Sequence, residues 1–230
     1  MDITNLSTYI LLGQLYSQTG HPKEAAAALN TYLKYKPNDG AAYLLLGKMD
    51  YQNGDYESTI ANMEKSISLD RNQREPYQYL FLSNVELGRG DEADKQIDQV
   101  LLFYPNSFET NLGIVRLHLL QKRNGSALLA LDKTKALAET DEQKALVYYW
   151  GAIVYERRND PKRAAQYWQD LLDLPETAMT SEMRAEAEQH LAAAGTATPT
   201  RKSPTRTPAP TRTPTPTASR TPTPTRTPMP

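Results

Sequence analysis

A repeat of 34 residues limits the possible folds of this chain more than any other feature of its sequence. Tyr9, Tyr43 and Tyr77 are spaced 34 positions apart, and so are Gly13 and Gly47. A repeat of this length is one supersecondary unit, and a single unit cannot bury its own apolar face. The chain is therefore predicted to fold as a stack of similar units that share a continuous core.

Each unit has the pattern of two helices joined by a tight turn. In the first unit, apolar residues recur at helical spacing over residues 6–19 and again over residues 22–36. Gly20 ends the first of these helices, and Pro22 is suited to the first turn of the second. Pro37 then ends the pair. The pattern predicts five such hairpins, over residues 6–39, 40–73, 74–107, 108–141 and 145–177.

The end of the array departs from the strict repeat. Three extra residues precede the fifth unit, so the last step of the repeat is 37 positions instead of 34. A further helix is predicted over residues 180–194, where Thr180 or Ser181 can cap the N-terminus. Its apolar stripe consists of Met183, Ala187 and Leu191. We expect this helix to cover the apolar face of the last hairpin.

The repeated residues resemble the tetratricopeptide repeat family over about residues 6–175. The first unit matches the family motif in Tyr9, Leu12, Gly13, Tyr16, Ala25, Leu29 and Pro37. The second and third units match it in Tyr43, Leu46, Gly47, Gly54, Asp55, Tyr56 and Met63, and in Tyr77, Leu80, Gly88, Ala93, Ile97 and Pro105. The resemblance implies an all-α fold, a right-handed α-solenoid of five helical hairpins with a C-terminal capping helix. Phe81 and Val115 stand where the family has a small residue, so we expect the third and fourth hairpins to pack more loosely or to rotate.

The composition changes at residue 196, which divides a repeat domain over residues 1–195 from a tail over residues 196–230. The 35 residues of the tail include 10 prolines and 13 threonines, which favours a disordered, extended chain. The tail carries six of the 26 basic residues, so the repeat domain keeps 20 basic against 27 acidic residues, a net charge of −7. The simplest role of the tail is a spacer. A basic arm for anionic surfaces and a platform for glycosylation or phosphorylation are the alternatives.

Several classes of chemistry find no support in the sequence. The chain has no cysteine, and His21, His118 and His190 have no second histidine at metal-ligand spacing. We expect no enzyme, no metal and no cofactor, and the acidic repeat domain opposes direct binding of nucleic acid. No apolar run approaches the roughly 20 residues of a membrane span, and no signal peptide is visible. The expected location is the cytoplasm, with the cell surface as the alternative if the N-terminus is truncated.

The expected function is a non-catalytic scaffold that binds a protein or peptide, with no small-molecule substrate and with the oligomeric state left open. In the family, the first helix of each hairpin lines a concave groove. Helical phase then gives an inward row with apolar anchors, suited to an extended or helical peptide. This row consists of Ile10, Gln14, Gln18, Leu44, Lys48, Tyr51, Gln52, Gln78, Leu82, Glu86, Leu112, Arg116, Leu119, Tyr149, Ile153 and Glu156. The alternative is an accessory or regulatory segment of a larger, surface-exposed protein, because residues 2–5 resemble the end of a preceding repeat.

Overall fold

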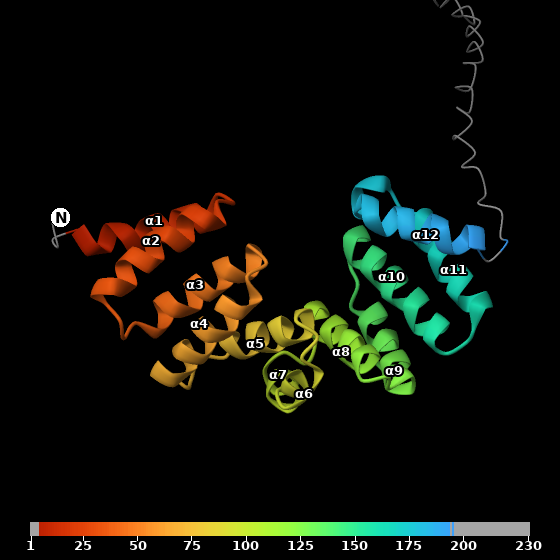
Figure 1. The fold of residues 1–230 in the computed structure, drawn as a ribbon, viewed down its shortest axis with the longest axis horizontal. Helices are drawn as coiled ribbons and strands as arrows, with labels where there is room; N and C mark the ends of the chain where they lie inside the picture. The colour runs from red at the N-terminus through yellow and green to blue at the C-terminus, as the bar shows by residue number, and fades with distance from the viewer. Residues whose placement is uncertain (1–4, 194, 196–230) are drawn as a thin grey trace, which may run out of the picture. The chain divides into compact units, whose positions relative to one another are not determined.

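The computed structural model describes residues 5–193 and residue 195, and every regular element in this part of the chain is a helix (Figure 1). The all-α solenoid class predicted from the repeat is thereby confirmed. The described residues all lie in a unit that spans Met1–Thr198. The predicted tail over residues 196–230 lies outside the described residues.

The helices follow one another as hairpins in chain order (Figure 1). The first two hairpins consist of α1 (Leu6–Gln18) with α2 (Pro22–Tyr35), and α3 (Gly40–Gln52) with α4 (Tyr56–Leu69). In the third, α5 (Glu75–Glu86) is followed by two short helices, α6 (Gly90–Asp94) and α7 (Ile97–Phe103). The last two are α8 (Phe108–Leu120) with α9 (Asn124–Ala136), and α10 (Asp141–Arg157) with α11 (Pro161–Leu172). The 3₁₀ turn η2 (Glu176–Ala178) and α12 (Ser181–Ala193) complete the array.

The turn inside every hairpin uses one residue in the left-handed region of backbone space. Gly20, Gly54 and Gly88 have φ angles of 75°, 77° and 69°. Lys122 and Asn159 take the same place in the fourth and fifth hairpins, with φ angles of 57° and 58°. Glycine adopts this conformation without strain, and asparagine adopts it more readily than other residues. The turn geometry is therefore maintained along the array even where the glycine is not.

Close packing within the hairpins depends on small residues at one position of the first helix. A Cβ atom on Gly13 would lie 2.7 Å from Leu29 Cγ, so the two helices approach closely only because Gly13 has no side chain. Phe81 stands at this position in the third hairpin and is fully buried. Its ring fits because Gly113 of the next hairpin leaves room, where a Cβ would lie 2.7 Å from Phe81 Cε1.

The two hairpins with a large residue at this position differ from each other. In the third hairpin, Lys95 and Gln96 interrupt the second helix and divide it into α6 and α7. In the fourth hairpin, Val115 is fully buried and the second helix, α9, is continuous. Of these two hairpins, only the third has an interrupted second helix, and looser packing or rotation of either hairpin stays a prediction.

The fifth hairpin begins at Asp141, four residues before the predicted boundary at 145. Thr140 Oγ1 accepts a hydrogen bond from the Gln143 backbone N–H at 3.3 Å, and Gln143 Oε1 accepts one from the Thr140 N–H at 3.4 Å. These two bonds form a capping box, which starts a helix at this point. The extra residues therefore belong to α10, which has 17 residues against 13 in α8.

The core consists of apolar clusters that join neighbouring hairpins. In the last cluster, Trp168 and Leu171 of α11 pack with Ala187 and Leu191 of α12. Trp168 is 1% exposed, so α12 covers the end of the array as predicted. Thr180 caps this helix, because its Oγ1 accepts a hydrogen bond from the Met183 N–H at 3.2 Å.

Candidate functional site

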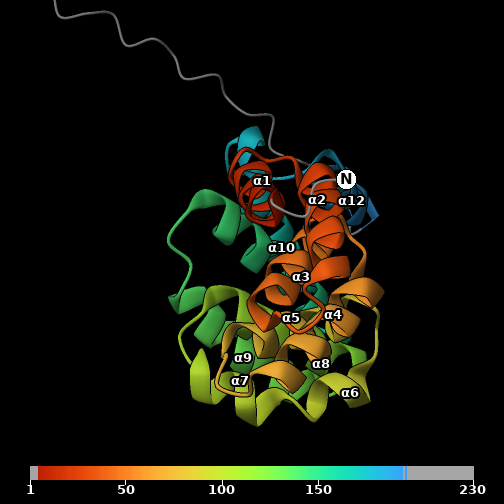
Figure 2. The same cartoon turned by 90° about the vertical axis from the view of Figure 1, so that its left-hand side faces the viewer.

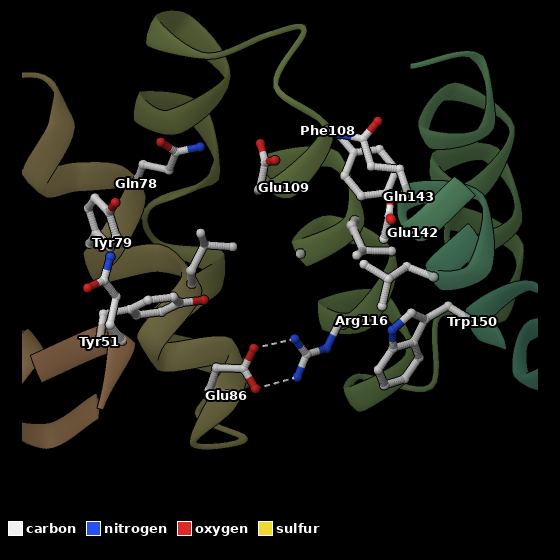
Figure 3. Close-up of a pocket in the computed structure, with 15 residues that line it drawn as sticks. Tyr51, Gln78, Tyr79, Glu86, Phe108, Glu109, Arg116, Glu142, Gln143 and Trp150 are labelled. Atoms are coloured by element: carbon white, nitrogen blue, oxygen red, sulfur yellow. Dashed lines mark hydrogen bonds and ion pairs between the residues drawn. The ribbon is translucent and has the colours of Figure 1, made fainter. Parts of the chain in front are cut away.

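A groove of about 720 Å³ runs along the first helices of the second to fifth hairpins, α3, α5, α8 and α10 (Figure 3). Equivalent residues of these helices share one helical phase, so the repeat itself aligns them along one surface. The groove is lined by Tyr51, Gln52, Gln78, Tyr79, Leu82, Glu86, Phe108, Glu109, Leu112, Gly113, Arg116, Glu142, Gln143, Leu146 and Trp150.

A bidentate ion pair between Glu86 of α5 and Arg116 of α8 crosses the groove (Figure 3). Arg116 Nη2 lies 2.7 Å from Glu86 Oε2, and Arg116 Nη1 donates to Glu86 Oε1. Both side chains are 22% exposed, so water screens this pair less than a surface pair. The Arg116 guanidinium carbon also lies 5.0 Å from the ring centroid of Trp150. The pair thus links three hairpins and orients the indole.

Aromatic rings form a second feature of the groove. The ring centroids of Tyr51 and Tyr79 are 5.3 Å apart at an interplanar angle of 75°. Burial raises the pKa of Tyr51 and of Tyr79 above the usual tyrosine value, so both hydroxyl groups stay protonated. Lys48 Nζ lies 5.9 Å from the ring centroid of Tyr79 and 2.6 Å from Glu75 Oε1. The tyrosines therefore present neutral rings and hydroxyl groups to the groove.

Polar side chains around Gln78 form a third feature of the groove and bond to one another. Gln78 Nε2 donates hydrogen bonds to Ser107 Oγ at 2.9 Å and to Thr110 Oγ1 at 3.0 Å. Ser107 Oγ in turn donates to Glu109 Oε2 at 2.8 Å. Glu109 and Glu142 belong to the first turns of α8 and α10, where a helix dipole favours negative charge. Neither glutamate forms an ion pair with any residue that the structure describes.

The structure brings part of the predicted inward row into this groove. The residues of the row that line it are Tyr51, Gln52, Gln78, Leu82, Glu86, Leu112 and Arg116. Leu119 and Ile153 line a smaller neighbouring groove of about 320 Å³, which also contacts Glu86, Arg116 and Trp150.

Other residues of the row lie elsewhere. Ile10, Gln14 and Gln18 belong to α1, and neither they nor Leu44 and Lys48 line these two grooves.

Tyr149 and Glu156 of α10 face the final helix instead of the groove. The Tyr149 hydroxyl donates to Glu186 Oε2 at 2.7 Å. Glu156 Oε1 accepts from Trp168 Nε1 at 2.8 Å and lies 2.7 Å from His190 Nδ1.

The register of α10 explains why Tyr149 and Glu156 lie outside the groove. Leu146 and Trp150 line the groove, and they follow Leu112 and Arg116 by 34 residues. The step of 37 residues expected from the sequence leads instead from Leu112 to Tyr149 and therefore to a different helical phase. The extra residues lengthen the C-terminal end of α10 and leave its N-terminal register unchanged. The Thr140–Gln143 capping box was the sequence signal that could have shown this.

The groove also contains residues that the helical phase did not predict: Tyr79, Phe108, Glu109, Gly113, Glu142, Gln143, Leu146 and Trp150. In the described residues, no group of three or more histidine, aspartate or glutamate side chains is placed to hold a metal ion. None of the described helices is long and apolar enough to cross a membrane.

Comparison with known proteins shows what part of the sequence and the fold resemble. Residues 10–64 match the family model described as tetratricopeptide repeat. A thermophilic tetratricopeptide repeat protein from Thermus thermophilus superimposes with a TM-score of 0.61 at 17% identity, over 81% of this chain and 99% of that one.

Two further solved structures have the same fold. MamA (41-end) from Desulfovibrio magneticus RS-1 has a TM-score of 0.63 at 16% identity, over 76% of this chain and 98% of that one. A chain of the APC/C hetero-tetramer Cut9–Hcn1 has a TM-score of 0.68 at 12% identity, over 83% of this chain and 37% of that one. No curated protein sequence matches the chain.

Proposed function

We propose that this chain, a tetratricopeptide repeat protein by its residues 10–64 and by its fold, is a non-catalytic scaffold that binds a peptide segment of a partner protein. The fold is that of protein-interaction scaffolds, and the proposal assigns the binding to the groove along α3, α5, α8 and α10. The observation that supports it most is the combination of the aromatic rings of Tyr51, Tyr79 and Trp150 with the aliphatic side chains of Leu82, Leu112 and Leu146 on this surface.

The aromatic residues of the groove suit apolar anchors of a peptide. Tyr51 and Tyr79 belong to one side of the groove, and Trp150 belongs to the other, next to the Glu86–Arg116 pair (Figure 3). Tyrosine and tryptophan dominate the energetics of protein interfaces, because they contribute large contact areas at low entropic cost. An aliphatic or aromatic side chain of the peptide would replace water between these rings.

The charge of the groove favours a basic residue in the ligand. Of its four charged side chains, Arg116 is already paired with Glu86, which leaves Glu109 and Glu142. Backbone hydrogen bonding, with help from the Thr140 hydroxyl, lowers the pKa of Glu142 and keeps this group ionised at neutral pH. A lysine or arginine close to the apolar anchor would therefore be attracted to these two glutamates.

A selection of phage-displayed random peptides on the full chain tests the proposal. Selected peptides should contain an apolar anchor, and Trp150→Ala should weaken their binding by about tenfold or more in fluorescence anisotropy. Tyr35→Ala is the matched control, since Tyr35 is 46% exposed on α2 outside this groove. Peptides that bind both variants with wild-type affinity would contradict the groove assignment.

The charge preference is tested separately with Glu109→Gln and Glu142→Gln in one chain. The double variant should bind a basic selected peptide several-fold more weakly than the wild type, and the difference should shrink at high salt. An uncharged peptide with the same apolar anchor is the control. Equal losses for both peptides would show that these glutamates do not attract a basic ligand.

A further inference from the structure

The groove of about 320 Å³ carries positive charge, although the repeat domain over residues 1–195 is acidic. We call it the smaller groove and the neighbouring one of about 720 Å³ the larger groove. The smaller groove is lined by Lys122 and Arg157 and by the Glu86–Arg116 pair, whose two charges cancel. Lys122 and Arg157 are exposed, and neither forms an ion pair with any residue that the structure describes. The smaller groove therefore has two unpaired cations.

Lys122 departs from the repeat at a position where the earlier hairpins have glycine. It follows Gly20, Gly54 and Gly88 in steps of 34 residues, and all four residues have a positive φ angle. A lysine in this conformation is strained, whereas a glycine is not. Strained residues of this kind cluster at sites that contact ligands. Because the side chain of Lys122 lines the smaller groove, the strain favours a ligand contact there.

Arg157 comes from a second departure from the repeat. It is the last residue of α10. A step of 34 residues from Leu120, where α8 ends, reaches Val154, so residues 155–157 have no helical equivalent in the fourth hairpin. This added turn of α10 brings Arg157 to the smaller groove. Two independent departures from the repeat thus supply cations to one surface.

Charges of opposite sign lie at opposite ends of α8 and α10, which are neighbours in the array (Figure 1 and Figure 2). Glu109 and Glu142, which line the larger groove, belong to the first turns of these helices. Lys122 lies just beyond the C-terminal end of α8, and Arg157 ends α10. From Glu142 to Arg157 the helix rises by about 20 Å, a distance that an extended peptide of about six residues spans.

The residues shared by the two grooves lie between these charged regions. Both grooves are lined by Trp150 and by the Glu86–Arg116 pair. The smaller groove adds apolar contacts, among them Ile153 and Leu120, which is 46% exposed. A peptide with its apolar anchor at Trp150 can therefore continue from the larger groove into the smaller one.

We propose, on the basis of the peptide binding proposed above, that the recognised segment also carries an acidic residue, whose side-chain carboxylate binds to Lys122 and Arg157. The basic residue of the segment binds near Glu109 and Glu142. The acidic residue lies on the other side of the anchor, about six residues along the extended peptide. A second basic residue at this place would be repelled, so the two grooves select a segment with one charge of each sign.

Selection of random phage-displayed peptides on the full chain tests this acidic subsite, and the selected sequences should combine an apolar anchor with an acidic residue. One such peptide is synthesised with an amidated C-terminus, together with an analogue in which glutamine replaces the acidic residue. Lys122→Gln with Arg157→Gln should weaken binding of the acidic peptide about fivefold or more in fluorescence anisotropy. The same double variant should not weaken binding of the glutamine analogue.

Lys133→Gln with Arg158→Gln is the matched control, because it removes two exposed cations that line neither groove. Arg158 directly follows Arg157 and has the same favourable interaction with the C-terminal end of α10. This control should bind both peptides as the wild type does. Lys122→Gly separates binding from folding, since it should stabilise the chain by relieving the strain and still weaken binding of the acidic peptide.

Selected peptides without an acidic residue, or equal binding of the acidic peptide by the wild type and by Lys122→Gln with Arg157→Gln, would overturn the acidic subsite. If Trp150→Ala still weakens peptide binding in that case, the scaffold function remains and only the subsite is lost. If Trp150→Ala has no effect, or if no peptide is selected at all, the assignment of the larger groove fails as well.

Discussion

Asp50 is a buried carboxyl group whose ionisation should weaken the fold at neutral pH. It lies on α3, is 9% exposed, and its Oδ2 accepts a hydrogen bond from Asn62 Nδ2 at 2.7 Å. Burial raises the pKa of Asp50 from its ordinary value of 3.8 to about 6, and the charge of Asp55 adds to this effect, while the Asn62 hydrogen bond opposes it. The folded chain therefore binds this proton more tightly than the unfolded chain does.

The sign of the pH dependence follows from this difference. Below pH 3.8 the group is protonated in both states, and between 3.8 and about 6 the unfolded state loses the proton first. The contribution of Asp50 to stability is therefore greatest at acid pH and falls as the pH rises through this window. Since each tenfold change in proton affinity corresponds to 1.36 kcal/mol, the loss amounts to about 3 kcal/mol at neutral pH.

Asp50→Asn removes the ionisation and keeps an oxygen that can accept from Asn62. Relative to the wild type, we expect this variant to gain about 2 kcal/mol in the free energy of unfolding between pH 4 and pH 7. Urea denaturation followed by circular dichroism at several pH values measures this gain. Asp132→Asn, which removes an exposed carboxylate on α9, is the control for the loss of one negative charge. If the difference between Asp50→Asn and the wild type is the same at both ends of the range, the reasoning is refuted.

Two further predictions concern the backbone. Gly151→Ala would place a Cβ 2.3 Å from the ring of Tyr167. We therefore expect this change to lower the free energy of unfolding by about 1–3 kcal/mol, measured by thermal denaturation. Gly125→Ala, whose Cβ would meet only a side-chain atom at 4.0 Å, should cause no loss, and equal effects of the two changes would contradict the packing argument. Lys122→Gly should raise the free energy of unfolding by about 1 kcal/mol, because it relieves a φ angle of 57°. Lys133→Gly within α9 should lower it by a similar amount in the same urea titration, and a loss at both positions would refute the strain at Lys122.

Much of the candidate groove could be predicted from the repeat, because residues 34 apart keep the same helical phase. Leu82, Leu112 and Arg116 line the groove as the phase predicts. Trp150 was not predicted, because its position in the groove depends on which end of α10 contains the extra residues of the fifth hairpin. The pairing of Glu86 with Arg116 was not predictable either, since it depends on the distance between two hairpins.

The sequence by itself determined the kind of architecture. Its 34-residue period, its helical spacing of apolar residues and its turn residues specify a stack of hairpins, because these are local properties of the chain. Tertiary structure alone decided which surfaces stay open. Leu15 and Met49 occupy equivalent positions, yet one is 53% exposed and the other is fully buried. The difference arises because Met49 packs against residues of α2 in the preceding hairpin, whereas burial of this kind cannot be recorded in the residue itself.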